Sequence, residues 1–307
     1  MAQKNIYAAM TAAALFWSGA FIAGKFSVPW IPTFTLTFLR FLFAAAALRL
    51  AGKTELFSDE GERNFCVKKE HWPVFLFNGI VGMFGYHVFF FLALKSTTAI
   101  NASIIGAMNP IVTTIFAAVW MKTKIPGRQI FGIILSFAGV LLTLSGGSLE
   151  VLQACSFNRG DLLMAAAVLC WAAYGVFSKC RGKGIPPRSL TYYSFVVCTV
   201  ILIPFVLWEK PWSFMGDIPA SAWLAVLYMS LFPSVAGYLI QQIAIKIIGP
   251  SRTSVFINLV PIFSMILAVP VLGETLKPVK VLTAGIIIAG VWICQFSIGE
   301  KKEEHGI

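Results

Sequence analysis

The sequence predicts an all-α integral membrane protein whose ten transmembrane helices form two inverted five-helix repeats. Of its 307 residues, 58% are hydrophobic and only 12% are charged, whereas soluble domains carry about 25% charged residues. The second indication is internal repetition. Leu15, Trp17 and Lys25 recur 154 positions later as Leu169, Trp171 and Lys179, and Ala93, Lys95, Ser103, Pro110, Gly139 and Val140 recur 151 positions later as Ala244, Lys246, Ser254, Pro261, Gly290 and Val291.

Ten apolar runs are each long enough to cross a hydrocarbon core of about 30 Å as a helix. The first follows Lys4 and continues to Lys25 without a small-residue cleavage site, which favours a spanning helix over a removable signal peptide. The remaining runs are separated by short polar connections, because exposed irregular backbone is confined to the aqueous sides. In chain order the predicted spans are residues 6–25, 33–51, 72–94, 99–121, 127–147, 160–180, 188–208, 219–243, 250–272 and 278–298.

Each repeat therefore contains five crossings. Because five is an odd number, the second half enters the membrane from the opposite face, and the repeats are inverted. We expect the first repeat within residues 1–150, the second within residues 158–299, and a polar cytoplasmic tail at residues 300–307. Duplicated hydrophobic halves are typical of transporters, in which two bundles rock about a site between them.

The basic residues indicate the orientation in the membrane. With the amino terminus in the cytoplasm, 17 of the 24 Lys and Arg residues face the cytoplasm and six face the other side, while Arg40 is left within the second span. This bias fits the positive-inside rule, with both termini cytoplasmic. Topology also accounts for the net charge of +11. Since the basic residues are spread over loops rather than gathered with aromatic residues on one stripe, we expect no nucleic-acid partner.

Several local strings resemble the EamA-type members of the drug/metabolite transporter superfamily. They are Leu15-Phe16-Trp17-Ser18-Gly19, Leu39-Arg40-Phe41, Ala107-Met108-Asn109-Pro110, the segment from Asn258 to Pro261, and Leu272-Gly273-Glu274-Thr275-Leu276. The strings cover both halves. The resemblance implies a ten-helix carrier that exports amino acids or other small metabolites across a bacterial inner membrane. One departure is that Lys122-Thr123-Lys124 stands where such first halves often carry a Gly-Glu pair, so this chain can use the acidic residue of that pair only once, at Glu274.

Polar and central aromatic side chains at membrane depth are the candidates for substrate contact, because a polar group there must find a partner or line water. His87 could bind substrate or carry a proton, or simply bond to a neighbouring helix. Asn109 and Asn258 precede prolines that free backbone carbonyls, which either line a cavity or only kink the helices. Central aromatic residues could stack on a flat or cationic ligand, or only pack. The predicted substrate-binding residues are Trp17, Tyr86, His87, Asn109, Trp171, Tyr238 and Asn258.

Arg40 is the one basic residue deep inside a predicted span. A buried guanidinium costs several kcal/mol unless it is paired, so the side chain snorkels to an edge, pairs with carbonyls or meets an anionic substrate group. Structural pairing is the favoured reading. No acidic residue lies in the middle of a span, which argues against a mid-membrane carboxylate that carries protons.

The leading interpretation is an alternating-access carrier that exports small organic metabolites, and amino acids in particular. The runner-up is a sugar-phosphate or nucleotide-sugar type of carrier from the same superfamily, which would need a Lys or Arg facing the cavity. A channel is less favoured, because neither a charged ring nor a filter loop is visible. An enzyme is not expected without a clustered nucleophile, a metal set or a carboxylate pair.

The six cysteines lack disulfide or metal spacing. We therefore expect no cofactor and no metal, and the expected partners are a small-molecule substrate and the lipid bilayer; a monomer is compatible with the sequence.

Overall fold

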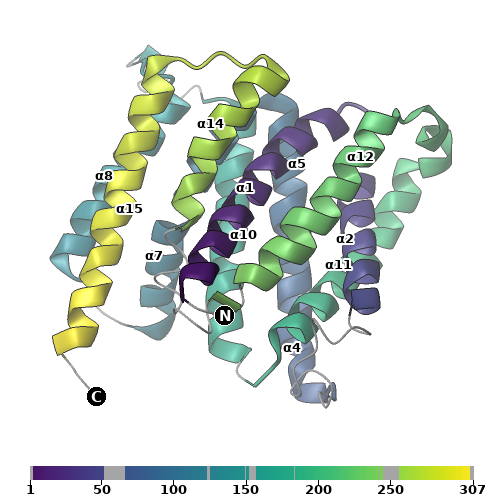
Figure 1. The fold of residues 1–307 in the computed structure, drawn as a ribbon, viewed down its shortest axis with the longest axis horizontal. Helices are drawn as coiled ribbons and strands as arrows, with labels where there is room; N and C mark the ends of the chain where they lie inside the picture. The colour runs from purple at the N-terminus through teal and green to yellow at the C-terminus, as the bar shows by residue number, and fades with distance from the viewer. Residues whose placement is uncertain are drawn as a thin grey trace.

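The computed structural model describes residues 3–51, 66–122, 125–148, 150–151, 157–182, 184–241, 243–244 and 256–304. Every regular element in these ranges is a helix. Eight helices in the described part are long and apolar enough to cross a membrane, and two shorter apolar helices cover Phe256–Leu272 and Pro278–Ile293. The prediction of ten spans is confirmed. The first helix begins and the last one ends at the same edge of the molecule (Figure 1); we call this the termini edge and the opposite one the far edge.

The first half supplies five spans, three of which are single helices and two of which are composite. They are α1 (Gln3–Ser27), α2 (Thr33–Ala51), a third span that joins η2 (Lys69–His71), α4 (Trp72–Phe77), η3 (Asn78–Gly85) and α5 (Tyr86–Ser96), a fourth made of α6 (Ala99–Gly106) and α7 (Asn109–Met121), and α8 (Gly127–Leu144).

The second half repeats this sequence of elements. Its spans are α10 (Arg159–Arg181), α11 (Pro187–Glu209), a composite of α12 (Ala220–Met229) and η6 (Ser230–Gly237), a second composite of η7 (Phe256–Asn258) and α14 (Leu259–Leu272), and α15 (Pro278–Glu304), with the short turns η4 (Pro211–Ser213) and η5 (Met215–Asp217) before α12. The start of the predicted ninth span, residues 250–255, lies outside the described residues. Helix α15 continues into residues 300–304, which the sequence analysis had assigned to the tail.

The third and eighth spans carry the same irregularity. Each contains an eight-residue π-helix in its middle, η3 in the first half and η6 in the second. The wider π turn is rare and is found mostly at functional sites. Its presence at matching points of both halves supports the duplication that the recurring residues predict.

Contacts between the halves are exchanged in pairs, as expected for inverted repeats. Helix α5 packs on α10, and in return α12 packs on α1. Likewise η3 packs on α11, and η6 packs on α2. Each half therefore places the composite span of its third crossing against the first two helices of the other half, so the surface between the halves runs through the centre of the molecule.

Helices α8 and α15 form a pair at one end of the assembly (Figure 1). They approach closely at Gly290, where an added Cβ would lie 2.6 Å from the carbonyl oxygen of Gly132. The Ser136 hydroxyl donates to the carbonyl oxygen of Ile287 at 2.9 Å. Small residues and hydroxyl bonds of this kind hold helices together in a membrane, where the hydrophobic effect between helices is absent.

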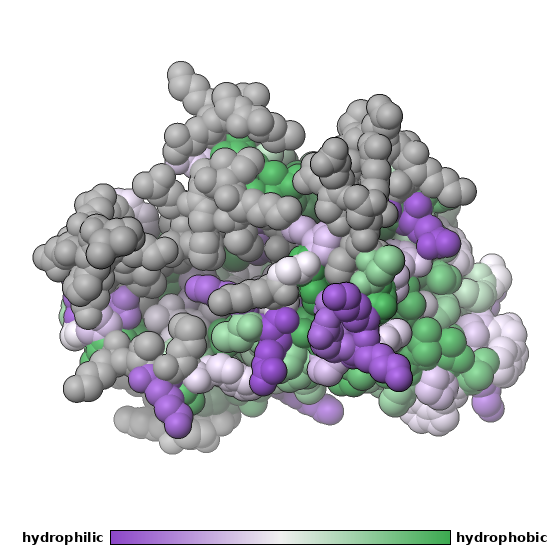
Figure 2. All heavy atoms as spheres, turned by 90° about the horizontal axis from the view of Figure 1, so that it is seen from below, coloured by the Kyte–Doolittle hydropathy of each residue, from purple (hydrophilic) through white to green (hydrophobic). Residues whose placement is uncertain are grey.

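The apolar core is concentrated on the far-edge side of the molecular centre. It includes Phe21 of α1, Phe91 and Leu94 of α5, and Ile100 and Ile104 of α6, all of them buried. The termini edge looks different: hydrophilic side chains stand out on this face between the residues drawn in grey (Figure 2). In this structure packed apolar side chains therefore lie between the centre and the far edge.

Candidate functional site

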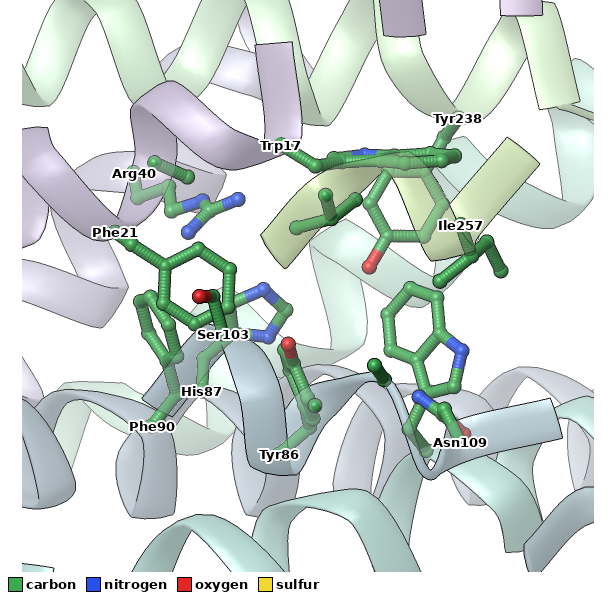
Figure 3. A pocket seen from close by; sticks show the side chains of 15 residues that line it. Trp17, Phe21, Arg40, Tyr86, His87, Phe90, Ser103, Asn109, Tyr238 and Ile257 are labelled. Atoms are coloured by element: carbon green, nitrogen blue, oxygen red, sulfur yellow. The ribbon is translucent and has the colours of Figure 1, made fainter. Parts of the chain in front are cut away.

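A pocket lies at the junction of the two halves, near the middle of the spans. Its cavity volume is about 70 Å³, well below the roughly 300–1,000 Å³ typical of small-molecule sites, so the walls would have to move apart to enclose a metabolite. Both halves contribute to its walls (Figure 3). The predicted residues that line it are Trp17, Tyr86, His87, Asn109, Trp171 and Tyr238.

Interrupted helices position part of this lining. The fourth span breaks between α6 and α7, just before Pro110, and the ninth changes from η7 to α14 just before Pro261. A proline has no N–H for the carbonyl four residues earlier, and those two carbonyls belong to Gly106 and Ile257. Both residues line the pocket. The proline positions thus place irregular backbone next to a cavity, where a membrane protein can tolerate it.

Asn258 is the predicted site residue that the structure does not place in the pocket lining. It is buried. The residue that corresponds to Asn109 by the 151-residue offset is Val260, and Val260 does line the pocket. Because successive helical residues are about 100° apart, the two-residue displacement of Asn258 turns its side chain away from the direction that Asn109 takes.

Aromatic rings form a continuous arc along the pocket. The ring centroids of Tyr86 and His87 lie 4.7 Å apart, those of Tyr86 and Trp171 lie 4.9 Å apart, and those of Trp171 and Tyr238 lie 5.5 Å apart. Trp17 of α1 adds a further ring, fixed by a hydrogen bond from its Nε1 to the carbonyl oxygen of Pro233 in η6 at 3.2 Å. Such a wall offers both apolar area and ring faces to a flat ligand.

Two polar atoms in this wall have no hydrogen-bond partner. They are the hydroxyl of Tyr238 and Oδ1 of Asn109, and both are buried. The Tyr238 hydroxyl points into the pocket (Figure 3). A buried polar group without a partner costs about 1–3 kcal/mol, so a bound molecule that satisfies these atoms would recover that free energy.

The comparison with known proteins decides the family. A model of the EamA-like transporter family matches residues 4–145 and 158–295, one match in each half. The chain belongs to this family. It is a membrane transporter and not a member of an enzyme family, and within the described residues no group of three His, Cys, Asp or Glu could hold a metal ion.

Two relatives support this assignment, and one solved structure has the same fold. The chain is 35% identical to the uncharacterized transporter YyaM of Bacillus subtilis over 292 residues, 95% of this chain and 93% of that one. It is 26% identical over 234 residues to the aromatic amino acid exporter YddG of Ancylobacter novellus, 76% of this chain and 77% of that one. A solved crystal structure shares the fold with a TM-score of 0.62 at 22% identity, covering 96% of this chain and 98% of that chain.

His87 of the EamA-like transporter is held by its own helix. Its side chain is buried, and Nδ1 lies 2.9 Å from the carbonyl oxygen of Met83. Because a carbonyl only accepts, Nδ1 carries the proton, and in the neutral ring Nε2 is an acceptor. The ring packs edge-on against Phe41 with centroids 4.6 Å apart. The proposed role of His87 in carrying protons stays a prediction.

Arg40 also lines the pocket, although the sequence analysis did not include it among the substrate-binding residues. It is 3% exposed, and its Nε donates to Oγ of Ser234 in η6 at 2.9 Å. Arg40 is therefore paired within the protein, as the sequence favours, and it also forms part of the pocket wall. The available signal was its isolation as the one basic residue deep in a span.

Two carboxylates close the far edge by capping helices of the other half. Glu209, at the end of α11, accepts from the backbone N–H groups of Phe34 and Thr35 at the start of α2, at 3.1 and 2.7 Å. Glu274, just after α14, accepts from Ala99 and Ile100 at the start of α6, at 2.7 and 3.1 Å. We call this pair the far-edge clamp.

The far-edge clamp corrects one sequence-based expectation. Glu274 was expected to have no equivalent, but Glu209 makes the same kind of contact from another span. A carboxylate at a helix N-terminus satisfies N–H groups that have no partner in the helix and interacts favourably with the helix dipole. Such a contact depends on where two helix ends meet in space. It therefore does not require the Gly-Glu sequence that precedes the contact of Glu274.

The Tyr238 hydroxyl permits a test of the pocket. We expect Tyr238→Phe to leave the ligand-free transporter as stable as before, or up to about 1–3 kcal/mol more stable, because it removes a buried hydroxyl without a partner. The same change should weaken substrate binding by roughly two- to tenfold, the cost of one hydrogen bond. Thermal unfolding in detergent with and without substrate measures both.

The matched control is Tyr174→Phe. Tyr174 neighbours Trp171 but does not line the pocket, and its hydroxyl is bonded to Ser178. This variant should lose stability and keep its substrate affinity. The reverse pattern in the two variants would show that the Tyr238 hydroxyl does not face substrate.

Proposed function

We propose that this EamA-like transporter exports small organic metabolites, amino acids foremost, by alternating access between its two halves. The observation that carries the proposal is the buried pocket at their junction, with its aromatic arc and its unpartnered polar atoms. The name of a relative that is 26% identical, an aromatic amino acid exporter, supports the same substrate class. The moving bodies would be the two repeats, at residues 1–150 and 158–299.

The proposed orientation rests on the charges at the two edges. We propose that the termini edge faces the cytoplasm of a bacterium and the far edge faces outward across its inner membrane. Supporting this, the described spans meet the termini edge at basic residues that include Arg49, Lys122, Lys179, Arg181 and Arg188. Lysine and arginine accumulate on the cytoplasmic side of membrane proteins.

Each part of the pocket has a role in this mechanism. The rings of Trp17, Tyr86, Trp171 and Tyr238 would hold a flat or apolar side chain, while Asn109 and the Tyr238 hydroxyl would bond to its polar groups. Because packed apolar side chains lie between the pocket and the far edge, the substrate would enter from the termini edge. Rocking of the halves would then break the far-edge clamp and open the other path.

A sugar-phosphate type of carrier is the second candidate, because Arg40 supplies the basic residue that such a carrier requires in its cavity. Two features weigh against it. Arg40 is the one Lys or Arg among the pocket residues of the described chain, and a phosphate group carries up to two charges. The remaining walls are largely aromatic and apolar, which suits a metabolite with an apolar body better than a sugar.

Purified protein in liposomes tests the proposal. The liposomes are loaded with mixed amino acids, amines, nucleosides and sugar phosphates, and mass spectrometry records which compounds leave and whether the rate saturates. We expect saturable loss of amino acids, those with large apolar side chains first. Unsaturable loss of everything below a size limit would establish a channel instead, and selective loss of sugar phosphates would establish the second candidate.

Two tryptophan variants connect the transport to the pocket. Trp171→Ala removes a central ring of the aromatic arc, and we expect it to reduce the saturable rate at least tenfold. Trp208→Ala is the control, because Trp208 is 76% exposed on the outside of α11. Equal rates in the two variants would place the transport path elsewhere.

A further inference from the structure

Arg40 is the charged side chain of the pocket. Among the residues that line the pocket in the described part of the chain, there is no carboxylate. The ion pairs recorded within the described ranges both involve Glu70, which precedes α4 at the termini edge. The guanidinium bonds to the Ser234 hydroxyl and lies 5.8 Å from the centroid of the Phe41 ring. Tyr86, His87 and Tyr238 line the same pocket.

These neighbours do not neutralise the charge. A hydroxyl bond and a cation–π contact stabilise a guanidinium only modestly. A buried charge without a counter-ion remains costly in a membrane interior. The carboxylates of Glu209, Glu274 and Asp161 all bond to other groups at the far edge. An anion bound in the pocket would supply the missing counter-charge to Arg40.

The geometry suits a planar anion. Ser234 occupies Nε of Arg40, and Figure 3 shows the end of the guanidinium directed into the pocket. The two terminal nitrogens of an arginine form a fork that matches the two oxygens of a carboxylate. The remaining polar lining includes acceptors, Asn109 Oδ1 and the neutral His87 ring, but no second fixed cation among the described residues.

We propose that Arg40 binds the carboxylate of the transported molecule, so that the pocket selects small organic carboxylates with a flat apolar body. The carboxylate accepts from the terminal nitrogens of Arg40, while the apolar body lies along the arc of Tyr86, Trp171 and Tyr238. An amino group is accommodated by acceptors and ring faces, but it is not required. Amines that lack a carboxylate are excluded, because they bring a second positive charge to Arg40.

This inference rests on the proposed function in one respect, namely that the pocket is the transport site. It goes further in assigning the selective group. Because Ser234 belongs to η6 of the second half and Arg40 belongs to α2 of the first, a carboxylate bound to Arg40 also contacts the surface along which the halves move. The charge of the substrate is thereby connected, through Arg40 and Ser234, to the π-helix η6 of the eighth span.

The test uses compounds that share one body and differ in charge. Tryptophan, indole-3-propionate, tryptophan amide and tryptamine are compared by ligand-induced thermal stabilisation of the purified full-length protein, with leucine, 4-methylpentanoate, leucine amide and isopentylamine as an aliphatic series. We expect the amides and amines to bind about tenfold or more weakly than the matched carboxylates, the loss that accompanies removal of a charged hydrogen bond.

Variants locate the effect. Arg40→Gln should abolish the preference for the carboxylate over the amide, and Arg40→Lys, which keeps the charge without the fork, should retain part of it. Arg159→Gln, an exposed arginine at the start of α10, is the control and should behave as the wild type. If Arg40→Gln does not fold, the comparison of compounds on the wild-type protein still decides the question.

The outcomes separate this inference from the proposed function. Binding of indole-3-propionate or 4-methylpentanoate without any amino-acid transport would contradict the proposed function and leave the carboxylate site standing. Tryptamine or isopentylamine binding as tightly as the matched acid would overturn the inference, whatever the amino acids do. Absence of binding by every carboxylate in both series would overturn it as well.

Discussion

Loss of the far-edge clamp is expected to open the pocket toward the far edge. In the double variant Glu209→Ala/Glu274→Ala, the starts of α2 and α6 lose the carboxylates that accept their backbone N–H groups. Hydrogen bonds to a charged group contribute about 1.5–3 kcal/mol each, and water replaces part of this at half-buried positions. Even a net change of about 1.4 kcal/mol moves the equilibrium between two states tenfold.

Thiol labelling measures this shift. Ser103 lines the pocket and is replaced by cysteine in a protein whose six native cysteines have been removed. A membrane-impermeant maleimide is then added on the far-edge side of sealed, oriented vesicles. We expect the double variant to react at least tenfold faster than the parent. Asp217→Ala, an exposed acid at the same edge, is the control, and equal labelling rates in all three proteins would contradict the clamp.

Gly160→Ala is expected to destabilise the fold strongly. An added Cβ would lie 2.7 Å from the backbone nitrogen of Thr97 and 2.8 Å from the carbonyl oxygen of Ala93, at the end of α5. Backbone atoms cannot rotate away, so α10 would have to separate from α5 and stretch the bond from the Thr97 hydroxyl to Asp161. Overpacking of this kind costs about 1–3 kcal/mol of unfolding free energy, and more where only backbone is in contact.

Gly175→Ala provides the comparison within the same helix. Apart from the backbone of its own helix, no atom lies within 4 Å of the position that its Cβ would occupy, and alanine is a better helix former than glycine by about 1 kcal/mol. We expect the melting temperature in detergent to fall for Gly160→Ala and to stay or rise for Gly175→Ala. Similar shifts in both variants would mean that α5 and α10 are less tightly packed at this point than the structure shows.

The spans were predictable because length and hydropathy determine which segments cross a bilayer. The second span was predicted at residues 33–51 and is observed at Thr33–Ala51. The π-helices η3 and η6 were not predictable in the same way. A π turn differs from an α turn in which carbonyl each N–H reaches, and an apolar run has the same composition in either case.

The sequence predicts how deep a residue lies in the membrane, but not which way its side chain points. Trp17, Trp171 and His87 lie near the middle of their predicted spans, and they line the pocket. Asn258 lies at a similar depth and is absent from the lining, because depth along a helix does not determine which way a side chain faces. Whether the lining residues bind substrate remains a prediction.

Contacts between distant segments were beyond the reach of the sequence. Glu209 bonds to Thr35, 174 positions earlier in the chain, and Arg40 bonds to Ser234, 194 positions later. No short sequence motif predicts either of these two contacts. Both depend on the register in which the two halves meet, which the recurring residues indicate in outline but do not specify for individual side chains.

The far-edge clamp has a consequence for the origin of the single chain. In both of its contacts the carboxylate comes from the second half and the N–H groups come from the first, while Arg40 comes from the first and Ser234 from the second. The halves have become complementary partners rather than equivalent copies. If they were made as separate polypeptides, self-pairing would compete with correct pairing, and covalent fusion removes that competition by supplying one of each to every molecule.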